Sequence, residues 1–555
     1  MTYVLQNLHW FLLFITVLVF VHELGHFLVA KWCGVRVLKF SIGMGPRVVS
    51  LRRGGTEYAI SLLPIGGFVK MLGDLPGAEI APEEAPYAFN NKKVWQRAAI
   101  VAAGPVFNFV LALFVYFGMF TGQQTFEATR IGSATVGGPA WSGGLRPGDT
   151  ILAVDGQKPR DYYELRELIG ARPNATVTIA YERDGEQRVA NVMTRAHDEA
   201  NVFQEREARG RIEVNNRFVQ PVVAIADKES PAGVAGVQSG DRIMSVDGKE
   251  VGAWHEVRAL LASGDGPVRL GIRRGEQVFD LTVTPGPAET TLGNDLLSAA
   301  DRKSGYTGLV SKESTLARVE ADTPAAAADL RVGDRVIAVT THDKDGHATT
   351  KPVNTLTLDL MMASDAHDAI TLTVQRGRAV STHEVKFAER EEKDDFKNVR
   401  RAQVFGAAGD PAATGVYTMA RKVGPVEGGK RALAHVGEDM TLIVKGIAKI
   451  ASGQLPMDSM GGPIMLFVIA EKSANSGLAE FLTMLAVISV NLGLINLVPV
   501  PVLDGGHLMF LAMEAIRRRP PSVRVREVAN VVGLVMLLML MVLVFKNDIV
   551  RFVLG

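Results

Sequence analysis

The sequence has 555 residues and a net charge of +1 at pH 7, so it is too long for a single hydrophobic core and gives no sign of a nucleic-acid partner. Its single cysteine excludes an internal disulfide framework and a four-cysteine zinc site. Four long apolar stretches, beside a charged fraction of 21%, indicate a membrane protein with a large polar insert.

The first apolar stretch, residues 3–30, contains the sequence H-E-L-G-H at residues 22–26 and no charged residue before it. On a helix, His22 and His26 lie one turn apart on one face, which is the spacing of two ligands of one zinc ion. In H-E-x-x-H sites the glutamate, here Glu23, is the general base. Ionisable groups at membrane depth cost about 2.5–3.5 kcal/mol each. We therefore interpret this stretch as a retained span with a metal site, and not as a signal peptide or a chance match.

The loop after this span, residues 31–97, holds ten Lys or Arg against five acids, and arginines also follow the third apolar stretch at residues 517–526. By the positive-inside rule both short loops are cytoplasmic. The two termini and the long middle section are then expected on the other side of the membrane.

Glycine turn signals at residues 43–45 and 66–67 flank the β-prone run 58–62 in the first loop. They predict a small hairpin near the metal site, because non-helical backbone at membrane depth must be buried in protein or line a wet cavity. Its edge either pairs with an unwound substrate or only covers the helices. The residues themselves leave both readings open.

The second apolar stretch, residues 98–126, is followed by a threefold repeat with periods of 92 and 93 residues. Each copy runs from a Pro-Ala pair to a Gly-Asp pair and continues into an apolar strand. The copies are residues 139–149, 231–241 and 324–334, and their strands are residues 151–154, 243–246 and 336–339. Asp-Gly turns at residues 155–156 and 247–248 predict hairpins in the first two copies.

These copies resemble PDZ domains of the bacterial protease type. The third copy departs from the pattern, with Asp329 in place of Gly144 and Gly236 and a polar insertion at residues 341–350. PDZ grooves accept a peptide tail as an added strand, but such copies can also form a shield that binds nothing. Both roles remain open at this point.

Residues 390–395 form a charge run that predicts a solvated linker. Residues 442–450 and 463–470 then predict amphipathic helices on the membrane surface.

The third apolar stretch, residues 481–503, contains Pro499 and Pro501, which disturb a helix, and Asp504 follows it. Asp504 and His22 lie at similar distances before the next basic residue, so both are expected near the cytoplasmic side. Asp504 can complete a set of two histidines and one carboxylate with water in the fourth position, which is an open catalytic site. His507 is a competing candidate for the carboxylate's place as ligand. A fourth span is expected at residues 528–545.

H-E-L-G-H in a first span, N-x-x-P-x-P-x-L-D-G-G-H in a third, G-x-G near residue 43 and PDZ-like units between spans two and three together resemble the site-2 protease family. The resemblance implies a polytopic α-helical membrane protein with four transmembrane helices, a membrane-associated β-hairpin and tandem PDZ-like α+β domains inserted between spans two and three. It also implies a zinc metalloendopeptidase of the bacterial inner membrane that cleaves single-pass membrane proteins within or near the bilayer after a first cut. Release of an anti-sigma factor in envelope stress signalling is such a reaction.

The resemblance implies His22, His26 and Asp504 as ligands of one Zn²⁺ ion and Glu23 as general base, with the site toward the cytoplasmic side. The residues that it implies at the substrate are Asn496, Pro499, Pro501, Gly43, Gly45, Tyr58, Ile60 and Gly67. The PDZ-like units would be periplasmic and exclude intact substrates, with peptide C-termini as candidate ligands. Two such units are expected of this subtype, so the third is a departure.

We therefore expect residues 1–126 to hold spans one and two with the hairpin, and residues 481–555 to hold spans three and four. PDZ-like units are expected at residues 127–200, 215–288 and 305–390, and a linker with surface helices at residues 391–480. Two other functions are compatible with the motifs. One is a membrane-anchored PDZ scaffold with an inactive metal site, and the other is a metal transporter, which the lack of repeated halves disfavours.

Overall fold

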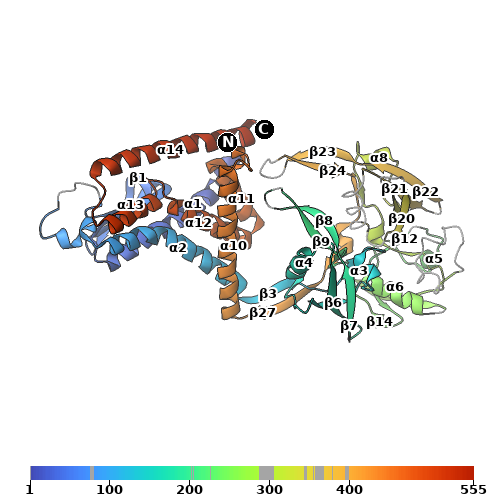
Figure 1. The fold of residues 1–555 in the computed structure, drawn as a ribbon. Coiled ribbons are helices and arrows are strands. Elements are labelled where there is room, and N and C mark those ends of the chain that lie inside the picture. Colours follow the sequence, from blue (N-terminus) through green and yellow to red (C-terminus); the bar gives the residue numbers. More distant parts are fainter. Residues whose placement is uncertain are drawn as a thin grey trace. The chain divides into compact units, whose positions relative to one another are not determined.

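The computed structural model describes residues 2–74, 80–201, 203, 205–225, 227–264, 266–286, 305–342, 347–353, 356, 368–377, 379–393 and 399–554. The chain divides into two compact units, which are drawn in Figure 1. The membrane unit consists of residues 1–124, 393–398 and 422–555, and the β-rich unit consists of residues 125–392 and 399–421.

Within the described residues, four helices of the membrane unit are long and apolar enough to cross a bilayer. They are Asn7–Trp32 within α1 (Thr2–Trp32), α2 (Val94–Phe120), α12 (Leu478–Leu497) and Val523–Leu554, which comprises α14 (Val523–Ile549) and a π-helical turn (Val550–Leu554). In their most apolar stretches, 11–39% of the residues are buried inside the protein, so most of these residues are at least partly exposed. Each of the four predicted spans coincides with one of these candidate membrane-spanning helices.

Two predicted span boundaries are wrong. The second span ends at Phe120, because strand β3 (Gly122–Glu127) begins two residues later. The third span ends at Leu497, and a loop that contains both prolines leads to a separate helix, α13 (Asp504–Arg517). Asp504 is therefore the first residue of a new helix and does not belong to the span itself.

The spans pack through small and aromatic side chains. Phe14 of α1 meets Phe481 of α12 edge to face, and Tyr116 of α2 lies in a second cluster with Val490 of α12. The predicted surface helices are parts of longer helices, α10 (Pro425–Ala451) and α11 (Pro463–Ser476). In Figure 1, α10 runs across the direction of α2 and α12, and the Tyr116 hydroxyl donates to the Asp439 carboxylate of α10 at 2.7 Å.

The predicted hairpin is confirmed and is larger than expected. Strands β1 (Val37–Arg53) and β2 (Thr56–Met71) both bend, so that residues of β1 pair with β2 on two sides: Phe40 pairs with Val69 and with Tyr58. Gly43 permits the bend, because its φ is +82° and a Cβ there would lie 2.5 Å from the carbonyl oxygen of Leu63. Among the described side chains, the large apolar ones that this sheet exposes are Met44, Val48, Val49, Leu51, Ile60, Leu62, Leu63 and Phe68.

Two short 3-10 turns, Ala85–Tyr87 and Phe89–Asn91, lead from the hairpin to α2. The strands that follow β3 are β4 (Ser133–Ala134), β5 (Thr150–Val154), β6 (Thr176–Arg183), β7 (Glu186–Met193), β8 (Arg195–Ala200), β9 (Arg206–Arg211), β10 (Val214–Asn215), β11 (Arg217–Val219), β12 (Val223–Ile225), β13 (Arg242–Val246), β14 (Lys249–Glu250), β15 (Val268–Arg274), β16 (Gln277–Val283), β17 (Leu309–Ser311), β18 (Arg318–Val319), β19 (Arg335–His342), β20 (Ala348–Pro352), β21 (Ala369–Arg376), β22 (Ala379–Lys386), β23 (Ala388–Lys393), β24 (Val399–Val404), β25 (Ala407–Ala408), β26 (Thr414–Val416) and β27 (Thr418–Val423). The helices among them are α3 (Pro139–Ser142), α4 (Tyr162–Gly170), α5 (Pro231–Val234), α6 (Trp254–Ser263) and α8 (Pro324–Ala327).

The β-rich unit contains three modules that follow the repeat, each with its own hydrophobic cluster. Their antiparallel sheets have the strand orders β5-β6-β7, β14-β13-β15-β16 and β20-β19-β21-β22. In each module a strand that precedes the sheet in the chain pairs with a strand that follows the sheet, and this pairing closes the module. The pairs are β4 with β10, β12 with β17 and β18 with β25. We call residues 128–216, 220–312 and 315–409 modules 1, 2 and 3.

The closing strands lie outside the predicted bounds 127–200, 215–288 and 305–390, so these bounds end too early. The predicted linker at residues 390–395 is also wrong, because residues up to 393 belong to β23, which pairs with β24. Residues 394–398 lie outside the described residues. After module 3 the chain returns as β26, which pairs with β11, and β27, which pairs with β3.

The repeated Gly-Asp pair has the same structural role in all three modules. Asp149, Asp241 and Asp334 each have side chains that are 1% exposed and bind an arginine of the neighbouring strand through two bonds of 2.6–2.8 Å. Each carboxylate also accepts a backbone N–H three residues earlier. The motif thus fixes the turn that precedes the first strand of each sheet.

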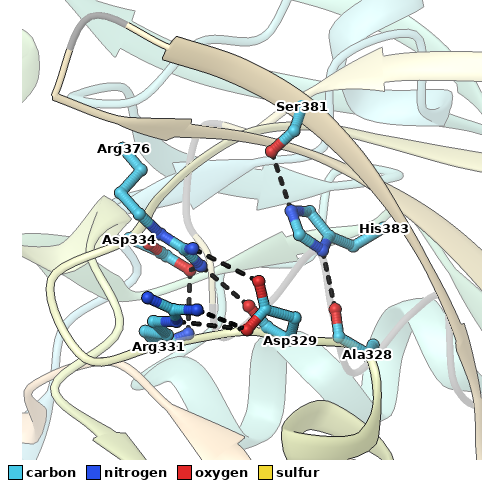
Figure 2. Close-up of polar contacts among 7 residues, drawn as sticks. All are labelled: Ala328, Asp329, Arg331, Asp334, Arg376, Ser381 and His383. Carbon is cyan, nitrogen blue, oxygen red and sulfur yellow. Dashed lines mark hydrogen bonds and ion pairs between the residues drawn. The ribbon is translucent and has the colours of Figure 1, made fainter.

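Module 3 accommodates Asp329 where the other modules have glycine. The φ angles of Gly144, Gly236 and Asp329 are +90°, +91° and +56°, and aspartate is among the residues that tolerate this left-handed conformation. Figure 2 shows the Asp329 carboxylate bonded to Arg331 (2.9 Å) and Arg376 (3.3 Å). The departure from the repeat is therefore compatible with the same turn.

Candidate metal centre

The three predicted metal ligands meet in the membrane unit. His22 and His26 lie one turn apart on α1, and Asp504 is brought to them by the start of α13. The Nε2 atoms of the two imidazoles are 3.3 Å apart, and Asp504 Oδ2 lies 3.2 Å from His22 Nε2 and 3.6 Å from His26 Nε2. Ligand bonds of about 2.0–2.1 Å around tetrahedral zinc place neighbouring donor atoms about 3.3 Å apart. The triangle of donor atoms therefore fits three corners of one zinc site.

Close packing of α1 against α2 forms the back wall of this site. Gly25 of α1 faces the backbone of α2, where an added Cβ would lie 2.3 Å from the carbonyl oxygen of Ala103. Gly104 of α2 faces the imidazoles, and a Cβ there would lie 2.3 Å from Nε2 of His26. Two glycines are thus required for the helices to approach this closely.

The outer nitrogens of both imidazoles contact α2. His26 Nδ1 lies 2.8 Å from the carbonyl oxygen of Ile100, and His22 Nδ1 lies 3.2 Å from the side-chain amide of Asn108. Such outer contacts fix the ring orientation of zinc-binding histidines. The motif reading missed both partners. The one polar amide in an otherwise apolar part of the second span could have pointed to Asn108. A backbone carbonyl, such as that of Ile100, leaves no signal in the sequence.

The position of Asp504 favours its ionised form. Burial of the carboxyl opposes ionisation, but hydrogen bonds to the two imidazoles outweigh it and hold the pKa of Asp504 below its usual range. The first turn of α13 adds the positive end of a helix dipole. Among the described residues, the ligand cluster comprises His22, His26 and Asp504, and it does not include His507.

Glu23, the predicted general base, lies where the hairpin crosses α1. The backbone of Val69 in β2 lies close to its carboxylate. A Cβ on Gly67 would lie 3.3 Å from the Glu23 side chain and 2.9 Å from the carbonyl oxygen of Ser41. Gly67, which was predicted near the substrate, is therefore beside the candidate base.

The other hairpin residues predicted at the substrate lie at the bend of β1, against α1 or on the exposed surface of the hairpin. Gly43 and Gly45 both have positive φ angles at the bend of β1. Tyr58 packs against Phe27 of α1, and Ile60 is 53% exposed.

The remaining predicted substrate residues lie between α12 and α13. Asn496 is in the last turn of α12, and Pro499 and Pro501 lie in the loop that leads to Asp504. Gly533 of α14 packs tightly against Pro501, because a Cβ added at Gly533 would lie 3.3 Å from atoms of Pro501.

The model of Peptidase family M50 matches residues 10–540 of this chain. The chain belongs to peptidase family M50. Among its M50 relatives, the regulator of sigma-E protease RseP of Salmonella typhimurium is 30% identical over 557 residues, with 99% of both chains covered. RseP of Escherichia coli is 30% identical over 554 residues with the same coverage, and a putative zinc metalloprotease of Vibrio cholerae is 28% identical over 562 residues, with 99% of this chain and 100% of the relative covered.

Membership in M50 confirms the resemblance to site-2 proteases. This M50 protein is a zinc metalloprotease that uses one zinc ion, and the residues of the candidate centre fit that ion in type and spacing. The alternative of a scaffold with an inactive metal site is accordingly not favoured.

Proposed function

We propose that this M50 protease hydrolyses peptide bonds of single-pass membrane proteins within or near the bilayer, with His22, His26 and Asp504 as zinc ligands and Glu23 as general base. The observation that carries the proposal is the triangle of donor atoms, with sides of 3.2–3.6 Å, formed by residues from opposite ends of the chain. Two of its three residues lie on α1, a helix long and apolar enough to cross a bilayer, which supports a reaction at membrane depth.

Each residue of the site has a defined task in this mechanism. When bound, zinc polarises the scissile carbonyl and lowers the pKa of a water to about 7. Glu23 takes the proton of the attacking water and passes it to the leaving amine. The contacts of Ile100 and Asn108 orient the two imidazoles from behind.

The hairpin is the candidate element for holding an unwound substrate. A helical substrate keeps its backbone bonded internally, so its peptide bond becomes accessible only after local unwinding. An extended segment can then pair with a strand edge. The contacts of Gly67 and Val69 with Glu23 support this role for β2, and Asn496, Pro499 and Pro501 are proposed to line the opposite side near Asp504.

We further propose that the three modules are PDZ-like and form a shield on the periplasmic side of the bacterial inner membrane. In module 1 a cavity of about 310 Å³ lies between α4 and residues 209–215. Arg209 of β9, which lines the cavity, binds Glu167 of α4 at 2.9 Å, and Arg211 binds Glu199, which also lines it, at 2.6 Å. A peptide tail would have to displace these ion pairs, which supports the shield over tail binding.

The names of the RseP relatives suggest a place in sigma-E regulation. For this chain we propose the corresponding reaction class, which is the second cut of a membrane-anchored regulator already shortened outside the membrane. Such a substrate should have a short periplasmic tail, since a bulky tail would collide with the shield.

Reporter cleavage tests the proposal directly. A tagged single-span reporter with a short periplasmic tail is co-expressed with the wild-type protein or with Glu23→Gln, and is also incubated with purified protein with and without a zinc chelator. We expect cleavage only by the wild type with zinc, and retained zinc in Glu23→Gln. A matched reporter with a folded periplasmic domain should stay intact. Cleavage by Glu23→Gln at the wild-type rate would contradict the role of the base.

A further inference from the structure

Asn108 of α2 is a completely buried amide next to the metal centre. Its Nδ2 lies 3.2 Å from Nδ1 of His22, and its Oδ1 has no hydrogen-bond partner among the described residues. The backbone carbonyl of Asn108 accepts a hydrogen bond from the Ser489 hydroxyl of α12 at 2.8 Å. The backbone is thus anchored on α12, while His22 is the polar partner that the structure records for the side chain.

The two imidazoles differ in what their outer nitrogens can do. His26 Nδ1 faces the carbonyl of Ile100, which can only accept, so His26 is held with its proton on Nδ1 and Nε2 free for a metal. His22 Nδ1 faces the side-chain amide of Asn108. Rotation of this amide by half a turn exchanges its donor nitrogen for its acceptor oxygen. The ligand-ready form of His22 therefore depends on Asn108.

Without a metal, His22 can keep its proton on Nε2 and donate it to Asp504 Oδ2, 3.2 Å away, while Nδ1 accepts from the Asn108 amide nitrogen. A zinc ligand needs Nε2 without its proton, and neutral His22 then carries the proton on Nδ1. The amide nitrogen cannot accept that proton, whereas Oδ1 can. In the ligand-ready form, Asn108 must turn Oδ1 toward His22.

We propose that Asn108 is the positioning residue of His22, whose amide supports both tautomers and holds the imidazole in its ligand-ready form through Oδ1. The inference deepens the proposed function and rests on His22 being a zinc ligand. The structure assigns the two histidines different tasks: His26 is fixed by the backbone, and His22 is set by a side chain.

The experiment measures zinc affinity of the purified full-length protein in detergent by competition with a chromophoric chelator. Asn108→Leu keeps a similar volume but cannot accept, and should bind zinc about 10- to 100-fold more weakly, the usual loss for an outer partner of a ligand. Asn108→Asp can only accept, and should bind zinc at least as tightly as the wild type. Ser489→Ala removes the backbone contact at the same depth and should leave the affinity unchanged.

The outcomes separate this inference from the proposed function. Wild-type affinity in Asn108→Leu, or a tenfold loss in Asn108→Asp, would overturn the positioning role. Asn108→Asp decides the matter even if the leucine variant is not recovered folded. His22→Ala is measured alongside. If His22→Ala binds zinc as tightly as the wild type, the ligand set of the proposed function is wrong. If zinc affinity falls in His22→Ala but not in Asn108→Leu, that ligand set stands and only the role of Asn108 is rejected.

Discussion

Gly104 faces His26 so closely that a Cβ on Gly104 would lie 2.3 Å from the imidazole Nε2, the nitrogen directed at the metal centre. Cβ atoms do not approach other heavy atoms to this distance, so the ring or the helix must move if one is added. The second span thus contributes to the site by having no side chain at this point.

Gly104→Ala should therefore disturb both ligands of α1 at once. We expect zinc binding to weaken about 10- to 100-fold, as when ligand orientation is lost, with the protein still folded. Gly118→Ala is the matched control, since it lies on the same helix and an added Cβ meets nothing within 4 Å. Zinc content after dialysis against a weak chelator measures the effect. Equal zinc content in the two variants would refute the close approach.

Gly67→Ala tests the contact between the hairpin and the candidate base. The new Cβ would meet the carbonyl oxygen of Ser41 at 2.9 Å and the Glu23 side chain at 3.3 Å, so β2 should shift relative to Glu23. We expect reporter cleavage to fall up to about 100-fold, because small displacements of reacting groups have effects of this size. Zinc content should stay at the wild-type level.

Gly437→Ala on α10 serves as the control for that experiment, because a Cβ there has open space. Loss of zinc in Gly67→Ala would show that the hairpin supports the ligands themselves. Unchanged cleavage would argue against any role of this contact in the reaction.

Asp548 near the end of α14 is completely buried and caps a helix that is distant in the sequence. Its carboxylate accepts from the backbone N–H groups of Gly462 (2.9 Å), Ile464 (2.8 Å) and Met465 (3.2 Å) at the start of α11. A negative charge at this end also matches the helix dipole. Asp548→Asn keeps the shape but offers one acceptor oxygen and no charge, so it should destabilise the membrane unit by about 1–2 kcal/mol.

Thermal unfolding in detergent measures this loss, and hydrogen exchange should show faster opening at residues 462–465. Lys546→Gln, an exposed change on the same helix, should have little effect. A melting temperature of Asp548→Asn equal to that of the control would mean that the cap contributes no stability.

Features of this protein that follow from short-range chemistry could be predicted from its residues. Apolar length predicted four spans, because a bilayer requires about 20 apolar residues per helix. The spacing of His22 and His26 predicted a shared metal, because residues four apart lie on one helix face. The repeated Gly-Asp pair predicted three similar modules, since each aspartate is needed at the same turn.

The way in which distant segments complete one another could not be predicted, because it depends on packing between them. The closing strand of each module, the doubled pairing of β1 with β2 and the start of a new helix at Asp504 all depend on partners far along the chain, which periodicity does not report. The same holds for Asn108 and Gly104, since an amide and a missing side chain acquire their meaning from the imidazoles they face. Local patterns specify which groups a helix face presents, whereas packing specifies what those groups meet.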